Sequence, residues 1–265
     1  MTDRKPQDLN RQRVDELYSS GAEDTRLTHS RAAQVEFLTT MRVLNDYVRA
    51  GMRVLDLGAA TGAYTLPLLE LGCTVDAVEL SETNAAILEQ RLSGRPGGRV
   101  FRGSAASLDA FPDGGYDIVL NFGPMYHIFD TAERDRCIRE SRRVCRADGR
   151  LFFAFISNDM VPLTECQYRD FFHPDTPCTY DHETFQVDND PFVFYTLDQM
   201  RSMLAAGGLA IEREIASDGV SELMAAEINA MSDESYAEYL RYHYYCSEKP
   251  EMLGRSNHLL FVCRP

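Results

Sequence analysis

The sequence predicts an α/β protein built on a mostly parallel sheet, and three observations favour this fold class. Short apolar runs alternate with segments of helical periodicity, as they do in βαβ units. One such run, Arg53–Leu57, leads directly into a glycine-containing turn, Gly58–Gly62, that opens a helix. The chain has 265 residues, of which 44% are hydrophobic and 26% charged, which suits one such domain with insertions.

The alternating elements follow in a regular order. Residues 1–30 are polar and are expected to form an arm, and apolar positions at helical spacing predict a helix from Arg31 to Ala50 that stops at Gly51. The next strands are expected at 53–57, 74–78, 99–102, 116–120 and 150–156, with helices at 64–71, 82–92 and 131–145 between them. Because parallel neighbours need a crossover connection, this order predicts a parallel sheet.

The rhythm breaks at Ser157 and resumes at Leu197. Residues 157–196 show little periodicity but contain eight aromatic residues between Tyr168 and Tyr195, and a net charge of −7 between Asp159 and Asp190. They form either a lid over a substrate pocket or a hydrophobic plug between layers. Residues 31–265 are thus expected to form one domain with insertions at 157–196 and about 217–257, and with further helices at 197–206 and 233–246 and strands at 209–215 and 258–263.

Charge and cysteine spacing argue against several classes of function. A net charge of −14 disfavours a nucleic-acid partner and favours a small-molecule substrate. The seven cysteines never form a C-x-x-C pair, which indicates reduced thiols in a cytoplasmic protein and no metal site. The N-terminus lacks the apolar region of a signal peptide, and no apolar run approaches the ~20 residues of a membrane span.

The turn after the first predicted strand points to a ligand site. Gly58 and Gly62 let the backbone bend sharply, and the helix that follows presents free N–H donors. A dinucleotide site, as in an NAD-dependent oxidoreductase, would need G-x-G-x-x-G at this place. Here the spacing is G-x-x-x-G with Asp56 two residues before it, and a carboxylate there suits an ammonium group better than a pyrophosphate.

A second carboxylate, Glu79, ends the next predicted strand, 17 residues after Gly62. A carboxylate at this position can accept hydrogen bonds from both hydroxyls of a ribose. A ribose without phosphate, together with an ammonium group, is what S-adenosylmethionine (SAM) offers.

Asp56-Leu-Gly58-x-x-x-Gly62 followed by Glu79 resembles the first two motifs of the class I SAM-dependent methyltransferases, and Asp117–His127 resembles their fourth-strand motif. The resemblance covers about Val35 to Ile156 well. It implies a Rossmann-like, seven-stranded, mostly parallel sheet with helices on both faces and a reversed last strand. The segments Glu36–Thr40 and Gly123–His127 resemble a bacterial subgroup of such enzymes that act on small molecules.

The same resemblance implies the residues of a SAM site. It assigns the amino-acid part of SAM to Asp56, Gly58 and Asn121, the ribose to Glu79, and the adenine to Leu80, Ser104 and Ala105. Ala59, Ala60, Gly62 and Gly123 complete the expected cofactor-binding set. Two positions depart from the family pattern, because related sequences usually have Gly where Ala60 stands and Asp or Asn where Ser104 stands.

The catalytic candidates are His127 and Tyr126, at the end of the fourth strand. An imidazole suits proton removal at neutral pH, but His127 can equally well pack against the cofactor or bond a main-chain group. Glu23, Asp24 and Arg26 of the arm either fold over SAM or stay solvated. The expected activity is methyl transfer to a small-molecule amine or phenol; the alternatives are a non-catalytic SAM-binding sensor or scaffold and an NAD-dependent oxidoreductase.

Overall fold

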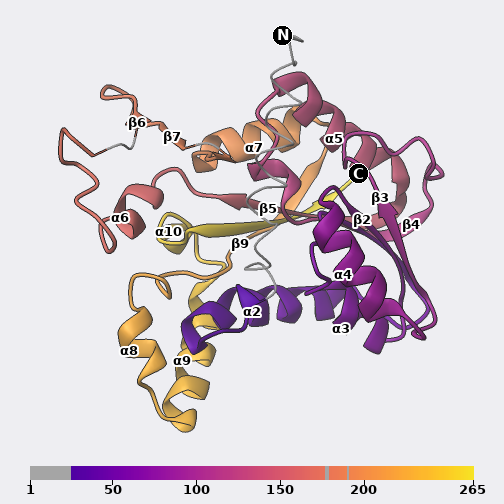
Figure 1. Cartoon of the computed structure of the whole chain (residues 1–265), viewed down its shortest axis with the longest axis horizontal. Helices are drawn as coiled ribbons and strands as arrows, with labels where there is room; N and C mark the ends of the chain where they lie inside the picture. Colours follow the sequence, from indigo (N-terminus) through magenta and orange to yellow (C-terminus); the bar gives the residue numbers. More distant parts are fainter. Residues whose placement is uncertain (1–24, 177–178, 190) are drawn as a thin grey trace.

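The computed structural model describes residues 25–265 except 177–178 and 190, and its centre is a seven-stranded sheet (Figure 1). The strand order is β3-β2-β1-β4-β5-β10-β9. The strands are β1 (Arg53–Leu57), β2 (Thr74–Glu79), β3 (Gly98–Arg102), β4 (Tyr116–Asn121), β5 (Cys145–Ile156), β9 (Ala210–Ala216) and β10 (His258–Arg264). The first five run parallel, and β10 is antiparallel to both β5 and β9, which confirms the expected sheet with its reversed last strand.

Helices cover both faces of this sheet, as Figure 1 shows. On one face lie α2 (Arg31–Tyr47), α3 (Thr65–Glu70) and α4 (Glu82–Leu92), and on the other lie α5 (Thr131–Val144) and α7 (Leu197–Ala206). Each face has its own apolar core, because the buried strands turn alternate side chains to opposite sides. The three-layer α/β fold is therefore confirmed.

The helix before the sheet is set by its cap and its apolar stripe. Ser30 accepts a hydrogen bond from the Ala33 N–H at 3.2 Å and so caps the first turn of α2. Val35 and Leu44 are fully buried against the sheet. The helix ends at Tyr47, a few residues before the predicted end at Ala50.

The fifth strand begins earlier than expected, at Cys145 instead of Arg150. Its pairing with β4 shifts register between Tyr116 and Ile118, so the segment 145–149 follows the sheet irregularly before regular pairing starts. A Cβ at Gly149 would lie 2.7 Å from the Asp117 carbonyl oxygen, so glycine allows this close approach.

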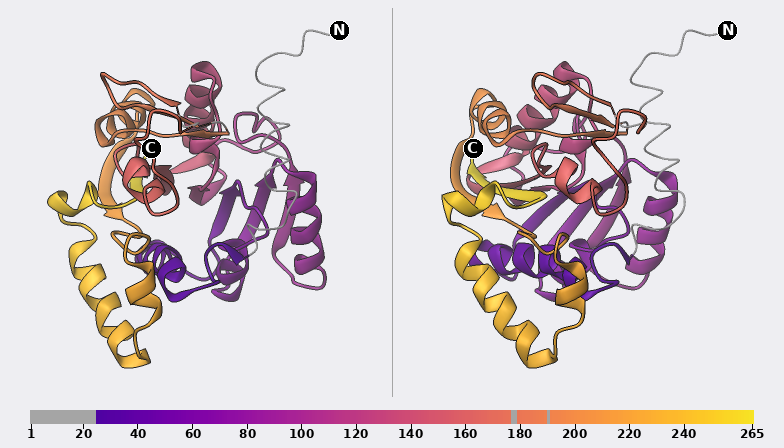
Figure 2. Two further views of the ribbon diagram at one scale, coloured as in Figure 1. Left: turned by 60° about the vertical axis from the view of Figure 1, so that its left-hand side comes forward. Right: turned by 90° about the vertical axis from the view of Figure 1, so that its left-hand side faces the viewer.

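Both inserted segments contain secondary structure beyond the helix predicted at 233–246, which the structure confirms. The first holds α6 (Val161–Glu165) and a small sheet of β6 (Thr179–Tyr180), β7 (Val187–Asn189) and β8 (Phe192–Val193). The second holds α8 (Ala225–Asn229), α9 (Asp233–Cys246) and α10 (Pro250–Leu253), and Figure 2 shows α8 and α9 projecting beyond α2. Apart from α9, these elements are too short to give a clear periodic signal.

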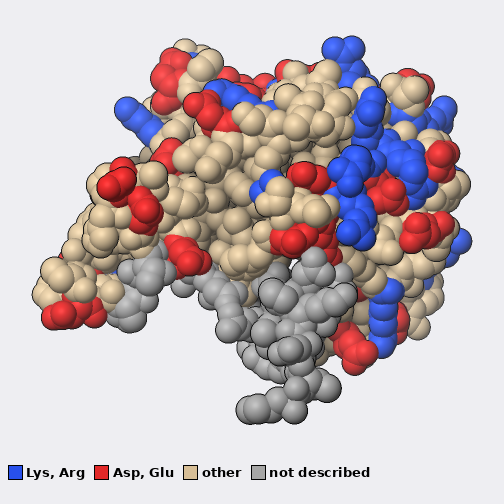
Figure 3. All heavy atoms as spheres, turned by 90° about the horizontal axis from the view of Figure 1, so that it is seen from above, with Lys and Arg blue, Asp and Glu red and all other residues tan. Residues whose placement is uncertain are grey.

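The surface shows both signs of charge close together. On the face in Figure 3, basic side chains gather on one side and acidic side chains lie among them. Arg143 contacts Glu140 at 2.7 Å, and Arg146 contacts Asp117 at 2.6 Å. Within the part of the chain that the structure describes, no helix is both long and apolar enough to cross a membrane.

Candidate active site

The glycine turn lies at the carboxyl edge of the sheet, pressed against the end of β4. Gly58 has φ of 75°, and a Cβ there would be 2.7 Å from the Phe122 carbonyl oxygen. Gly62 has φ of 97°, and a Cβ there would lie 2.5 Å from a methyl group of Leu88. Both positions need glycine, because a side chain meets either backbone strain or a neighbouring atom.

Ala60 occupies the middle of this turn, where related sequences usually have glycine. Its φ is 47°, a left-handed conformation that costs a residue with a Cβ roughly 1–2 kcal/mol. Its N–H donates to Glu79 Oε2 at 2.7 Å. This bond ties the turn to the end of β2 and helps to offset the strain.

Asp56 is buried at the end of β1, beside the turn. Its Oδ2 accepts a hydrogen bond from the Thr65 hydroxyl at 2.6 Å. Burial raises the pKa of Asp56 to about 6, partly offset by this bond, and the nearby Glu79 raises it further. A carboxylate that is poorly solvated in this way gains from an added cation.

Glu79 is held in a fixed orientation by the backbone. It is 7% exposed, and its two carboxylate oxygens accept the Ala60 and Ser81 N–H groups, each at 2.7 Å. An oriented carboxylate at a strand end suits a pair of neighbouring hydroxyls, as in a ribose. The two acids predicted from the sequence therefore flank one turn.

The residues expected near the adenine follow the ends of β2 and β3. Leu80 is 39% exposed directly after Glu79, and the Gly103 N–H donates to the Glu79 carbonyl at 3.0 Å. Ser104 and Ala105 come next, with the Ser104 hydroxyl accepting from the Ala106 N–H. The structure thus brings this set to the edge that holds Glu79, and its role with adenine stays a prediction.

Asn121 and Gly123, at the end of β4, differ in where they face. The side-chain amide of Asn121 donates to Cys137 Sγ and Ser141 Oγ of α5, both at 3.2 Å, so it faces α5. Gly123 has φ of 123°, and a Cβ there would lie 3.8 Å from the Gly58 carbonyl oxygen. Of these two residues, therefore, Gly123 lies next to the turn, whereas the side chain of Asn121 points away from it towards α5.

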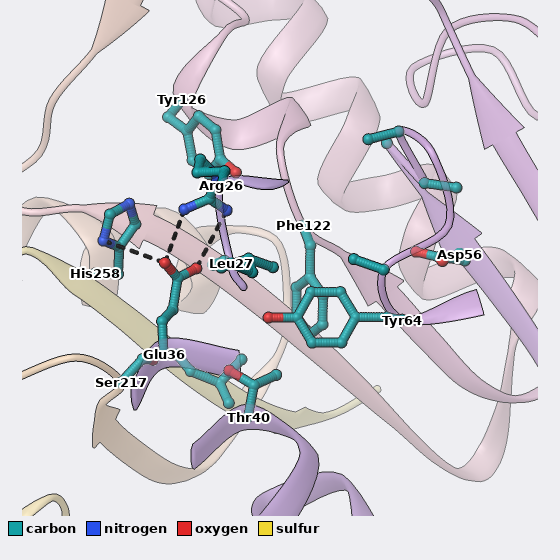
Figure 4. A pocket seen from close by; sticks show the side chains of 16 residues that line it. Arg26, Leu27, Glu36, Thr40, Asp56, Tyr64, Phe122, Tyr126, Ser217 and His258 are labelled. Carbon is teal, nitrogen blue, oxygen red and sulfur yellow. Dashed lines mark hydrogen bonds and ion pairs between the residues drawn. The ribbon is translucent and has the colours of Figure 1, made fainter. Parts of the chain in front are cut away.

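Two neighbouring cavities lie at this edge of the fold, and the inner one borders the turn. The inner cavity, about 40 Å³, is lined by the turn residues Asp56, Gly58, Ala59 and Ala60 and by Tyr64 among others. The outer cavity, about 740 Å³, lies between α2, the 157–196 insertion and the segment after β9. Four side chains line both cavities: Arg26, Glu36, Tyr126 and His258 (Figure 4).

These four shared residues include polar groups that sequence reasoning did not bring together. Arg26 donates to Glu36 Oε2 at 2.8 Å, and His258 Nδ1 lies 3.6 Å from the same oxygen (Figure 4). His258 Nδ1 is also 2.7 Å from Asp218 Oδ2. Burial alone would lower the pKa of His258, but Glu36 and Asp218 outweigh it and raise the pKa to about 9.

Only parts of this network carried a signal in the sequence. Glu36 lies in a segment that resembles the bacterial subgroup, and Arg26 was one of the arm residues considered for contact with SAM. Glu23 and Asp24 of that arm lie outside the described residues. Asp218 and His258 had no local motif, so sequence reasoning missed them.

The two catalytic candidates sit differently around the cavities. Tyr126 lines both of them. His127 is 9% exposed, with Nδ1 at 3.0 Å from the Pro191 carbonyl oxygen and its ring packed on Phe192. Burial lowers the pKa of His127 to about 4, so it is a weak proton acceptor at neutral pH, and its bond to Pro191 matches the alternative of a main-chain contact.

Comparison with known proteins finds similarity over the central part of the chain. Residues 55–153 match the family model described as "Methyltransferase domain". The chain is 32% identical over 127 residues to the ubiquinone/menaquinone biosynthesis C-methyltransferase UbiE of Hahella chejuensis, covering 46% of this chain and 49% of that protein. It is 30% identical over 125 residues to the demethylmenaquinone methyltransferase of Paenarthrobacter aurescens, covering 47% of this chain and 46% of that protein. The chain therefore spans about half the length of these curated relatives.

A solved structure extends the likeness to nearly the whole fold. The PH0226 protein of Pyrococcus horikoshii OT3 superposes with a TM-score of 0.63 at 18% identity, covering 94% of this chain and 98% of that one. Its low identity supports the fold alone, whereas the family model covers the turn and both ends of β4. Residues 55–153, which include the glycine turn and both acids, thus match a methyltransferase domain, and the whole fold is similar to that of the PH0226 protein.

Proposed function

We propose that this chain transfers a methyl group from SAM to a small-molecule amine or phenol. The observation that carries this proposal is the pair of buried, oriented carboxylates, Asp56 and Glu79. They lie on either side of a turn that requires glycine at its first and last positions. The small inner cavity reaches Asp56 and shares lining residues with the larger outer cavity, so the turn lies close to the space proposed for the acceptor.

The residues of the chain act mainly by alignment. In this proposal Asp56 pairs with the ammonium of SAM, Glu79 accepts the ribose hydroxyls, and Gly123 leaves room beside Gly58. When bound, SAM supplies the methyl group on an electrophilic sulfonium. Because charge is dispersed in such a transfer, holding the partners in line and excluding water contribute most.

The outer cavity suits a ring-containing acceptor. Its lining contains the aromatic side chains of Phe192, Phe194 and Tyr126 together with many polar and charged side chains. One relative is named a demethylmenaquinone methyltransferase and another a ubiquinone/menaquinone biosynthesis C-methyltransferase, and ring-containing acceptors are consistent with the aromatic part of this lining. In this proposal the 157–196 insertion, which supplies both phenylalanines, forms the lid.

Calorimetry with SAM, its demethylated product and NAD tests the proposal. We expect binding of SAM and of the demethylated product and no binding of NAD, because the turn lacks the glycine pattern of a dinucleotide site. Binding of NAD alone would contradict the proposal. SAM binding without methyl transfer to a broad panel of phenols and amines would instead indicate a sensor.

The affinity for SAM should depend on pH through Asp56. Its pKa of about 6 means that below this pH the carboxyl holds a proton that must leave before it can pair with an ammonium. We therefore expect SAM affinity to fall by up to about tenfold per pH unit below about pH 6 and to level off above it. Calorimetric titrations at several pH values measure this, and Asp56→Asn should bind weakly with no such step. An unchanged step in the Asn variant would assign the titration to another group.

A further inference from the structure

The carboxylates around the outer cavity already have partners in the chain. Arg26 pairs with Glu36 at 2.8 Å, and Arg169 pairs with Glu165 at 2.6 Å. Asn257 donates to Glu222 at 2.9 Å, and burial raises the pKa of that carboxyl. The many acidic residues of the sequence thus do not make this cavity a free anionic surface.

Asp218 is committed to holding one side chain, His258. Its Oδ1 accepts from the Ser256 hydroxyl at 2.5 Å and from the His258 N–H at 3.0 Å, while its Oδ2 faces His258 Nδ1 at 2.7 Å. Asp218 is 4% exposed, so this set of bonds fixes the imidazole ring in one orientation.

The other edge of the His258 ring faces the cavity boundary. Because Nδ1 is bonded to Asp218, Nε2 is the nitrogen left to meet a ligand, and no described residue forms a hydrogen bond with it. Figure 4 shows this nitrogen on the ring edge turned away from Glu36. The side chain is 18% exposed and lines both cavities, so Nε2 can be reached from the acceptor side.

We propose that the Nε2–H of His258, oriented by Asp218, donates to the nucleophilic oxygen of the acceptor, and that the acceptor class is therefore acidic hydroxyl compounds, such as phenols or enols, bound as oxyanions. This inference rests on the proposed function and narrows its choice between amine and phenol. A pKa near 9 keeps the ring protonated at neutral pH, so both ring nitrogens are donors.

The number of lone pairs decides between oxygen and nitrogen. An amine nitrogen has one lone pair, and a hydrogen bond from His258 would occupy the pair that must attack the methyl carbon. An oxyanion has further pairs, so it can accept from Nε2 and still react. In the transfer, one oxygen pair forms the new oxygen–carbon bond, the carbon–sulfur bond breaks and its electron pair stays on sulfur, so no proton has to be removed in that step.

Binding of 4-nitrophenol tests this inference without turnover. Its oxyanion absorbs visible light, so a titration with the protein, with and without the demethylated product of SAM, reports both affinity and ionisation. At the pH where the free phenol is half ionised, we expect the oxyanion absorbance to rise on binding to the wild-type chain. A charged hydrogen bond is worth about 1.5–3 kcal/mol, so His258→Ala should weaken binding by roughly tenfold or more and abolish the rise.

A matched probe and a second variant make the result specific. The neutral amine 4-nitroaniline has a similar shape, and its affinity should change by less than about twofold in His258→Ala. His258→Gln keeps an uncharged donor and should bind 4-nitrophenol with intermediate affinity, while thermal denaturation checks that both variants fold.

Three outcomes would overturn the inference: no binding of 4-nitrophenol to the wild-type chain, equal affinity in wild type and His258→Ala, or stronger binding of the aniline. Calorimetry with SAM on the same preparation separates this from the proposed function. If SAM binds and the nitrophenol response is missing, the assignment of His258 is wrong but the proposed function still stands. If SAM does not bind, the proposed function fails, and the titration without cofactor still reports on His258.

Discussion

Replacing Glu79 by alanine is expected to weaken SAM binding by about a hundredfold, equivalent to about 3 kcal/mol. The variant loses the carboxylate proposed to accept the ribose hydroxyls. It also leaves the Ala60 and Ser81 N–H groups without the oxygens that hold them at 2.7 Å, so the turn loses its tie to β2. Calorimetry with SAM measures the change.

A nearby glutamate provides the control for this variant. Glu82 lies three residues further on, in the first turn of α4, and its side chain is exposed. Glu82→Ala removes the same charge from the same region, so it should change SAM affinity by less than about twofold. If Glu79→Ala also stayed within twofold of the wild type while folding normally, the ribose assignment would be wrong.

Replacing Gly58 by alanine should lower the free energy of unfolding by about 3 kcal/mol and impair SAM binding with it. Part of the loss is backbone strain at a φ of 75°. The rest comes from the new Cβ, which would lie 2.7 Å from the Phe122 carbonyl oxygen and 2.7 Å from Pro124 Cδ. Because one of these contacts is backbone, relief requires the turn and the end of β4 to move apart. Denaturant unfolding measures the loss.

Two other glycines serve as controls that separate the cost of backbone strain from the cost of a steric clash. Gly94 has φ of 77° with nothing within 4 Å of an added Cβ, so Gly94→Ala should lose only about 1 kcal/mol. Gly254 has φ of −68° and also has open space, so Gly254→Ala should stay within about 0.5 kcal/mol. If Gly58→Ala cost no more than Gly94→Ala, the turn would not depend on its contact with β4.

The fold, and the glycine turn with its two flanking acids, could be predicted from local patterns. A strand that is buried on both faces, such as β1, has a mostly apolar sequence. The helix α4 was predicted with the ends that the structure shows, Glu82 and Leu92. The glycine turn was predictable because G-x-x-x-G with an acid before it is a contiguous motif. The secondary structure of the 157–196 insertion was not, because strands of two or three residues have no measurable period.

The side chains at the boundary of the two cavities, where we propose that the acceptor binds, could be identified only from the tertiary structure. Three side chains from distant parts of the sequence meet there: Glu36 from α2, Asp218 from the segment after β9, and His258 from the first residue of β10. Only the folding of the chain around the sheet brings them together. The charge of the cavity also could not be inferred from composition. The sequence has a net charge of −14, but the carboxylates that line the outer cavity have partners within the fold.

The sequence alone thus determined the fold class, the family resemblance and the two acids at the glycine turn, Asp56 and Glu79, because strand periodicity and the turn motif are local properties of the chain. Tertiary structure decided that Arg26 and His258 neutralise Glu36 and Asp218 at the boundary of the two cavities. The physical reason is that the free energy of a charge depends on its solvation and on the charges within a few ångströms, and residues distant in sequence supply both.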